Sequence, residues 1–316
     1  MAKLFKIYLT EALRLAYWLP LRRLVQVLPR SFSYRIARSI GRMMCRISGR
    51  KRSLLQQGLV FLFGSGYPRE SVQRTFVNYA LNSIDVFYYP SLTRMKTAEM
   101  VEYRGIAHIA NALKKGKGAI LLHGHFGNEE FLMPAIAFAV DCPVNQLASR
   151  WEPSQDDSLF LRLPNKVRRY AFKMRIGYRE SLPIRFLYID KGVKGAYTAL
   201  KNNELLLLAA DGREGSNWIQ VNFMDRTALY SDGPMRIAMK TGASVLPVFI
   251  VRKKDGIHQV IVEEPLALDA TGDKERDLRI NTQKFVDRLC SYVTRYPCHY
   301  MKLFWQDLHY FKEFNG

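Results

Sequence analysis

The sequence predicts an α/β fold, with a mainly parallel sheet flanked by helices and an N-terminal amphipathic helical attachment. Three observations support this prediction. Short apolar runs, such as 119–122, 204–210 and 244–251, are typical of buried parallel strands. Segments with helical spacing separate these runs, and such alternation is typical of α/β proteins. Finally, the first sixty residues have an excess of positive charge, and their apolar and basic residues recur at the spacing of amphipathic helices.

The predicted elements follow one another from residue 69 to residue 295. Helical spacing covers 69–89, and a short helix over 105–115 ends at a Gly-Lys-Gly break. Beyond that break the chain alternates. We expect strands at 119–122, 204–210, 244–251 and 258–263, a further strand in VNQLASR before Arg150, and helices at 131–140, 192–201, 233–242 and 276–295. No linker is evident, so residues 60–316 are predicted to form one domain and residues 1–59 a helical attachment.

The overall composition excludes several classes of protein. The 316 residues are 48% hydrophobic and 24% charged, which is typical of a globular chain and not of a disordered one. The four cysteines form no C-x-x-C pair, so we expect idle or buried thiols and no zinc site or disulfide set. No run of roughly 18 apolar residues predicts a spanning helix. Glu11 and Arg14 interrupt the only signal-peptide-like segment, so we expect the chain to stay on the cytoplasmic side.

Positive charge is concentrated near the N-terminus. Residues 1–60 hold thirteen of the 48 lysines and arginines and one acid, Glu11, within a net charge of +20. Apolar and aromatic residues of 3–28 alternate with cations, as in helices that lie in a membrane interface. A row of arginines follows at a spacing of three or four residues, which predicts that they share one helix face: Arg35, Arg38, Arg42, Arg46 and Arg50. The isoleucines and methionines between residues 36 and 47 should lie largely on the opposite face.

This basic segment predicts attachment to an anionic membrane surface. An ordinary solvated helix face is the plainer alternative. Nucleic-acid binding is not expected, because the basic helix lacks a helix-turn-helix partner or zinc ligands.

The candidate site lies where strand 119–122 ends, since ligands of open α/β sheets bind beyond the carboxyl ends of strands. The sequence there is His123-Gly-His125-Phe-Gly-Asn-Glu129-Glu130. We expect His125 in the strand-to-helix loop and Glu130 in the first helical turn, reaching back to it. Gly124 and Gly127 would allow the tight turn and a close approach to substrate.

A histidine oriented by a carboxylate is suited to general-base catalysis. His125 would take the proton from a hydroxyl that attacks a thioester, with Glu130 fixing its tautomer. Because the chain has no G-x-S-x-G nucleophile elbow, we expect direct transfer without an acyl-enzyme. Backbone N–H groups of the glycine turn are candidates for stabilising the oxyanion.

Three alternatives remain open from the residues alone. The two histidines could simply form hydrogen bonds with backbone groups at the strand end and have no role in catalysis. The protein could be a metal-dependent hydrolase using His123, His125 and Asp211, with a further ligand from His258, His299 or His309. It could also be a non-catalytic scaffold that binds membranes through residues 1–60.

The segment HFGNEE resembles the H-x-x-x-x-[DE] motif of the glycerolipid acyltransferase superfamily, and most closely its lipid A late acyltransferase branch. The resemblance covers nearly the whole chain. Glu129 stands where Trp is common, and Gly212 follows Asp211 where Gln is usual. The other matching segments are KGKGAILLHG, Arg150 after a probable strand, ELLLLAADGREG, GPMRIAMKTGASVLPVFIVR and YPCHYMKLFW.

The resemblance implies a lipid-biosynthetic acyltransferase on the cytoplasmic face of the inner (plasma) membrane, bound peripherally. An acyl carrier protein or acyl-CoA thioester would donate the acyl group to a lipid or glycolipid hydroxyl, such as that of a lipid A precursor in lipopolysaccharide biosynthesis. Arg150, Arg213 and Arg226 would bind substrate phosphate. His123 and Asp211 would support the pocket and its turn. No metal or other cofactor is implied.

Overall fold

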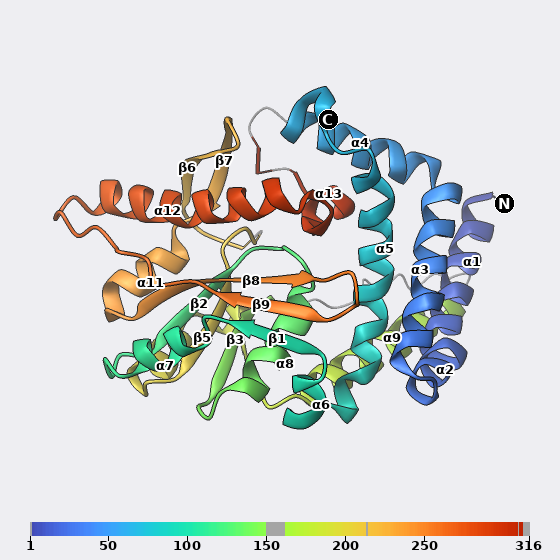
Figure 1. The fold of residues 1–316 in the computed structure, drawn as a ribbon, viewed down its shortest axis with the longest axis horizontal. Helices are drawn as coiled ribbons and strands as arrows, with labels where there is room; N and C mark the ends of the chain where they lie inside the picture. Colours follow the sequence, from blue (N-terminus) through green and yellow to red (C-terminus); the bar gives the residue numbers. More distant parts are fainter. Residues whose placement is uncertain (1, 150–161, 213, 309, 312–316) are drawn as a thin grey trace.

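The computed structural model describes residues 2–149, 162–212, 214–308 and 310–311, and its centre is a seven-stranded sheet (Figure 1). The strands run in the order β1-β9-β8-β2-β5-β3-β4. A separate hairpin pairs β6 with β7. The bounds are β1 (Val101–Arg104), β2 (Ala119–His123), β3 (Val144–Ala148), β4 (Arg185–Tyr188), β5 (Leu205–Ala209), β6 (Trp218–Phe223), β7 (Arg226–Ser231), β8 (Ser244–Arg252) and β9 (His258–Val262).

The predicted α/β class with a mostly parallel sheet is confirmed. Strands β8, β2, β5, β3 and β4 pair in parallel, and β9 returns antiparallel to β8 after a tight turn. Strand β1 is parallel to β9. The sequence reading missed β1, β4 and the β6–β7 hairpin, because none of them is a continuous apolar run.

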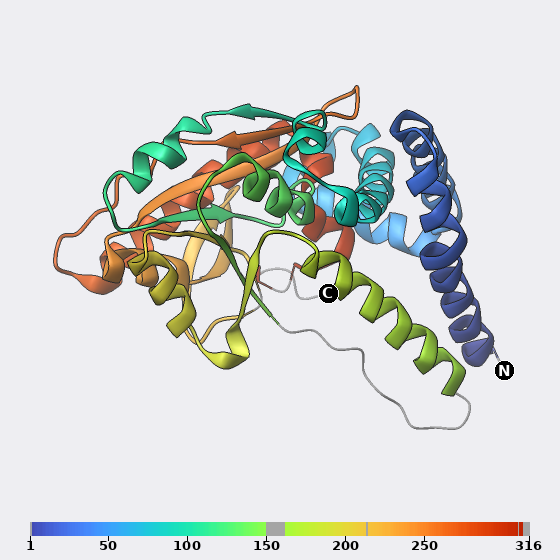
Figure 2. The same ribbon diagram turned by 90° about the horizontal axis from the view of Figure 1, so that it is seen from below.

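Helices cover both faces of the sheet (Figures 1 and 2). Successive side chains of a strand point to opposite faces. Ile120 and Leu122 therefore belong to one core cluster with α12 residues such as Phe285, while Leu121 belongs to another with Phe131 of α8. The bounds are α5 (Glu70–Asp85), α6 (Arg94–Ala98), α7 (Ala107–Leu113), α8 (Glu129–Ala139), α9 (Arg162–Glu180), α10 (Lys194–Lys201), α11 (Gly233–Thr241), α12 (Lys274–Arg295) and α13 (Met301–Trp305).

The N-terminal segment is helical and packs against the rest of the protein. Its elements are α1 (Ala2–Ala16), the π-helix η1 (Tyr17–Leu21), α2 (Arg22–Val27), α3 (Arg30–Ile47) and α4 (Gly49–Phe63). Helix α1 lies along α9, where Arg168 pairs with Glu11 at 2.9 Å. Trp18 of η1 is buried beside Phe87 and Tyr178. Helix α4 continues without a break through the predicted boundary at residues 59 and 60.

Helix α3 buries a face that hydrophobicity did not predict. Its buried residues are the mainly small ones that follow one another at helical spacing: Ser33, Tyr34, Ala37, Gly41 and Cys45. A Cβ at Gly41 would lie 2.6 Å from the Cα of Val77, so glycine lets α5 approach closely. Met43 and Ile47, which lie on the expected apolar side, are exposed instead.

Among the described helices, none combines the length and the apolar character that a membrane span requires.

Candidate functional site

Strand register brings His125 and Asp211 together. In the parallel pairing of β2 with β5, His123 stands opposite Ala209, and the N–H of Ala210 donates to the carbonyl of His123 at 2.8 Å. His125 and Asp211 each lie two residues beyond this last paired position. Both side chains therefore leave the same edge of the sheet, where parallel strands place their ligand sites.

Asp211 holds His125 through three contacts. Its Oδ1 is 2.7 Å from the ring Nδ1 of His125, and both carboxylate oxygens accept the backbone N–H of His125, at 3.0 and 3.1 Å. The Asp211 side chain is fully buried. With Nδ1–H donating to Asp211, the other ring nitrogen, Nε2, is left as the proton-accepting atom.

The Nε2 side of the ring is partly open. The His125 side chain is 23% exposed, and the Oε2 atom of Glu129 lies 3.7 Å from Nε2. Trp305 of α13 makes an edge contact with the imidazole, with ring centroids 5.6 Å apart. A substrate hydroxyl would therefore approach Nε2 beside a carboxylate and an indole.

Glu130 does not occupy the position that the sequence reading assigned to it. Helix α8 begins at Glu129, so Glu130 is rotated by about 100° from its neighbour. Its carboxylate forms an ion pair with Arg175 of α9. The contacts of His125 are with Asp211 at Nδ1 and Glu129 at Nε2, so the expected His125–Glu130 pair is corrected to His125–Asp211.

The two carboxylates make His125 more basic. Burial opposes protonation, but Glu129 and then Asp211 raise the pKa of His125 to about 9. Burial, opposed by the charge of His125, raises the pKa of Glu129 to about 7. Although burial works against ionisation, His125 and Lys302 hold the pKa of Asp211 well below its usual range. Asp211 thus remains a carboxylate whenever His125 gains or loses its proton.

The turn after β2 depends on glycine. Gly127 has φ +72°, and a Cβ there would lie 1.8 Å from the carbonyl oxygen of Ile250, so no other residue fits. Gly124 is also confined, with a Cβ position 3.0 Å from Leu289. The N–H groups of residues 125, 126 and 127 all donate within the protein. These three N–H groups of the turn therefore already have acceptors within the protein.

His123 is buried below the turn. Its Nδ1 lies 3.2 Å from the carbonyl of Gly124, and its Nε2 has no partner among the described residues. Burial lowers the pKa of His123 to about 4, so the ring is neutral. His123 therefore lies next to the turn as a neutral side chain.

The further metal ligands considered from the sequence do not join His125 and Asp211. His258 contacts Asp85 and His299 accepts the N–H of Arg252, while His309 lies outside the described residues. Within the described ranges, no three His, Cys, Asp or Glu side chains are grouped as metal ligands.

Two of the three predicted phosphate ligands, Arg150 and Arg213, lie outside the described residues. The third, Arg226, begins β7, and its guanidinium lies over the ring of Phe61, 4.7 Å from the ring centre.

A second histidine–carboxylate pair contacts the HFGNEE turn through Asn128 and was not predicted from the sequence. Asp85 of α5 accepts hydrogen bonds from Tyr34 at 2.6 Å, Arg252 at 2.6 Å and Asn128 at 2.7 Å, and His258 lies at 3.1 Å. The side-chain oxygen of Asn128 also accepts the N–H of Phe131 and so caps α8. The network therefore ties the HFGNEE turn to α3, α5 and β8.

Comparison with known proteins agrees with this architecture. The profile of the bacterial lipid A biosynthesis acyltransferases matches residues 5–306, nearly the whole chain. A phosphatidylinositol mannoside acyltransferase of Mycolicibacterium smegmatis is 24% identical over 289 residues, which are 89% of this chain and 87% of that protein. The Mycobacterium tuberculosis enzyme of the same name is 25% identical over 226 residues, 69% of this chain and 64% of that protein. The family resemblance read from the motifs is thereby confirmed, and the chain belongs to the bacterial lipid A biosynthesis acyltransferase family.

Proposed function

We propose that this acyltransferase moves a fatty acyl group from an acyl carrier protein or acyl-CoA thioester to a hydroxyl of a membrane glycolipid, with His125 as general base and Asp211 as its orienting carboxylate. The observation that supports this most strongly is the 2.7 Å contact between Nδ1 of His125 and Asp211. It leaves Nε2, the atom on the partly open side, to receive the hydroxyl proton.

The proposed reaction is direct. Neutral His125 takes the proton from the acceptor hydroxyl as its oxygen bonds to the thioester carbonyl carbon. The carbon–sulfur bond then breaks, and the imidazolium returns the proton to the departing thiolate. Asp211, which stays ionised, stabilises the imidazolium between the two steps. No protein nucleophile is used, so no acyl-enzyme forms.

The acceptor is proposed to be a phosphate-bearing glycolipid. The family is described by lipid A biosynthesis, and the relatives are named for phosphatidylinositol mannoside. A lipid A precursor and a phosphatidylinositol mannoside-like lipid are therefore the two acceptors to compare first. Arg150, Arg213 and Arg226 are proposed as phosphate ligands.

The N-terminal helices are proposed to hold the protein peripherally on the cytoplasmic face of the inner membrane. Among the described residues, twelve of the seventeen exposed large hydrophobic side chains lie within residues 4–60, the segment that also carries the row of arginines. Exposed apolar bulk next to cations favours an anionic membrane surface. The same positive charge would attract an acidic carrier protein.

An acyl-transfer assay tests the proposal. Wild type, His125→Ala and Asp211→Asn are incubated with labelled acyl carrier protein and acyl-CoA donors and with a lipid extract that contains both acceptor classes. Mass spectrometry then identifies new lipids. The product should fall by about 10²–10⁴-fold in both variants. Equal product from wild type and His125→Ala would disprove the role of His125. A stable acyl adduct on the wild-type protein would disprove direct transfer.

A further inference from the structure

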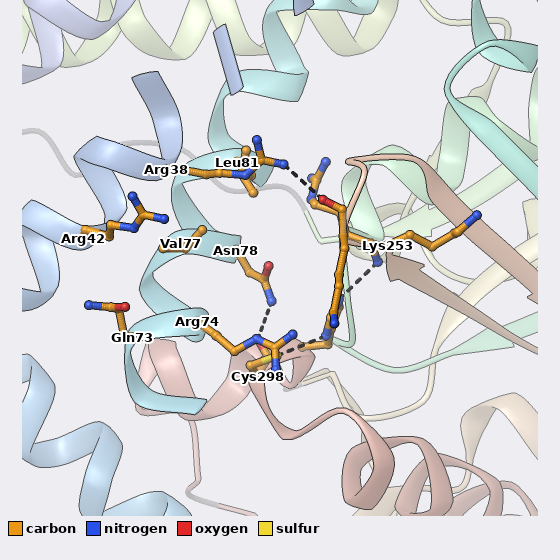
Figure 3. A pocket seen from close by; sticks show the side chains of 12 residues that line it. Arg38, Arg42, Gln73, Arg74, Val77, Asn78, Leu81, Lys253 and Cys298 are labelled. Atoms are coloured by element: carbon orange, nitrogen blue, oxygen red, sulfur yellow. Dashed lines mark hydrogen bonds between the residues drawn. The ribbon is translucent and has the colours of Figure 1, made fainter. Parts of the chain in front are cut away.

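A cavity of about 220 Å³ lies between α3, α5 and the turn that joins β8 to β9 (Figure 3). In the view, Arg42 extends from α3 toward Val77 of α5, and Arg38 extends past Leu81 toward the β8–β9 turn. None of the twelve described residues that line the cavity is acidic. Six of them are basic: Arg38, Arg42, Arg74, Arg252, Lys253 and Lys254.

Only half of these cations are neutralised within the described residues. The paired ones are Arg74 with Glu70, Arg252 with Asp85 and Lys253 with Glu102. The side chains of Arg38, Arg42 and Lys254 have no carboxylate partner in the described part of the chain. Arg38 instead donates to the carbonyl of Lys254 at 3.5 Å. Three cations without a carboxylate partner, from two elements, thus line one cavity, where a bound anion would reduce their mutual repulsion.

A buried donor in the cavity wall also lacks an acceptor. The Arg252 side chain is 4% exposed, and its terminal nitrogens donate to Asp85, Asn82 and Tyr34. Its Nε finds no partner among the described residues. A buried charged N–H without an acceptor costs more than an exposed one, so the wall favours an oxygen ligand.

The neighbouring histidine responds to this positive charge. The ring of His299, another wall residue, accepts the N–H of Arg252 at 3.1 Å and is therefore neutral at Nε2. Burial, and then the charges of Arg252, His258 and Arg74, lower the pKa of His299 to about 3. His299 is therefore neutral, and the positive charge of the cavity comes from its arginines and lysines.

We propose that this cavity binds a phosphate group, at a site separate from the reacting atoms at His125. Guanidinium groups bind phosphate oxygens in a bidentate manner, and the three uncompensated cations match the charge of a phosphate ester. The favoured source is the headgroup of an anionic membrane lipid, because Phe32, Met43 and Ile47 on the same helix are exposed and would meet its acyl region. A soluble phosphate compound would offer the same chemistry.

The cavity also adjoins the support of the catalytic turn. The carbonyl of His299 accepts the N–H of Gly127 at 2.7 Å, and Asn78 donates to the carbonyl of Cys298 at 2.9 Å. A phosphate in the cavity would therefore bind next to the segment that holds the HFGNEE turn.

Vesicle binding by the full chain tests the proposal without any acyl donor, so the result does not depend on the proposed transfer reaction. Phosphatidylglycerol–phosphatidylcholine vesicles are compared with phosphatidylcholine alone. The cavity variant is Arg38→Ala/Arg42→Ala. The matched control, Arg46→Ala/Arg50→Ala, removes two charges from the same stretch, outside the cavity lining. Diffuse attraction predicts equal losses for the two variants, whereas the site predicts a loss about ten-fold larger for the cavity variant.

A second variant and a soluble probe complete the test. Lys254→Ala, an exposed change on the β8–β9 turn, should also weaken binding if the cavity is the site. Calorimetric titration with inorganic phosphate separates the sources: phosphate binding lost in the cavity variant, with unchanged vesicle binding, supports a soluble phosphate ester. Equal vesicle losses in both double variants, together with no phosphate binding by wild type, would overturn the proposal.

Discussion

Two histidine–carboxylate pairs in this protein respond to their surroundings in opposite ways. His125 lies 2.7 Å from Asp211, and its pKa rises to about 9 because Glu129 and Asp211 outweigh burial. His258 lies 3.1 Å from Asp85, yet burial and the charge of Arg252 lower its pKa to about 4. A neighbouring carboxylate is therefore not enough to make a histidine basic.

The difference arises from the other groups around each carboxylate. Asp85 is fully buried, and its negative charge is already compensated by Arg252. Asp211 faces a histidine that is 23% exposed and has a second carboxylate, Glu129, on its other side. The His258–Asp85 pair holds elements together, whereas the His125–Asp211 pair is the one proposed to move a proton.

The largest expected effect separates Asp211 from Glu130. Asp211→Asn should lower kcat/KM by about 10²–10⁴-fold, since it removes the charge that stabilises the imidazolium. Glu130→Gln, whose carboxylate pairs with Arg175, is the matched control and should lose far less. Steady-state kinetics on both variants checks this. Equal losses of kcat/KM in the two variants would contradict the assignment of the orienting role to Asp211 alone.

Breaking the buried ion pair between Asp85 and Arg252 should lower the stability of the protein. Asp85→Asn leaves Arg252 charged and buried, which should lower the free energy of unfolding by about 3–5 kcal/mol. Glu70→Gln, which breaks an exposed pair with Arg74, should cost less than about 1 kcal/mol. Urea denaturation measures both. A loss at Asp85 no greater than that at Glu70 would contradict the structural role of the network.

Stability should also depend on pH through the buried histidines. The folded pKa of His258 is lowered to about 4, so the unfolded chain binds the proton more readily. The contribution of His258 to stability is present above its unfolded pKa of about 6.5 and is lost as the pH falls toward 4. The free energy of unfolding should decrease as the pH is lowered from 7 to 4, and a His258→Gln variant should show a smaller decrease. The same slope in wild type and variant would assign the effect to other groups.

Catalysis should also increase with pH, but over a more alkaline range than stability. Protonated His125 is inactive as a base, so kcat/KM should rise with pH up to about 9. Glu129→Gln removes a charge that raises this pKa and should shift the profile to lower pH. A profile that does not move in Glu129→Gln would show that Glu129 has no influence on His125.

The smallest expected effect concerns Asn128, which links the His258–Asp85 pair to the turn that carries His125. Asn128→Ala removes the cap of α8 and a donor to Asp85, and should cost about 1–2 kcal/mol of stability together with part of the activity. Thr93→Ala removes the cap of α6 and serves as control. It should cost about 1 kcal/mol without changing kcat at a temperature where both variants are folded. Unchanged kcat in Asn128→Ala would separate the network from catalysis.

The alternation of strands and helices, the family and the position of the candidate site could be predicted from the sequence. Apolar runs such as 119–122 and glycines such as Gly127 act locally, through burial pattern and backbone freedom, and can be read from the chain. Short half-buried strands such as β4 carry too little of that pattern to be recognised.

Which side chains meet could not be predicted and follows from the tertiary structure. Glu130 is near His125 in sequence, but Asp211, 86 positions away, reaches it because β2 and β5 pair in parallel in one register. Likewise, α3 buries Gly41 and its small neighbours because close approach to α5 outweighs the hydrophobicity of Ile47. Contacts of this kind depend on strand register and helix packing between distant segments, and no local pattern encodes them.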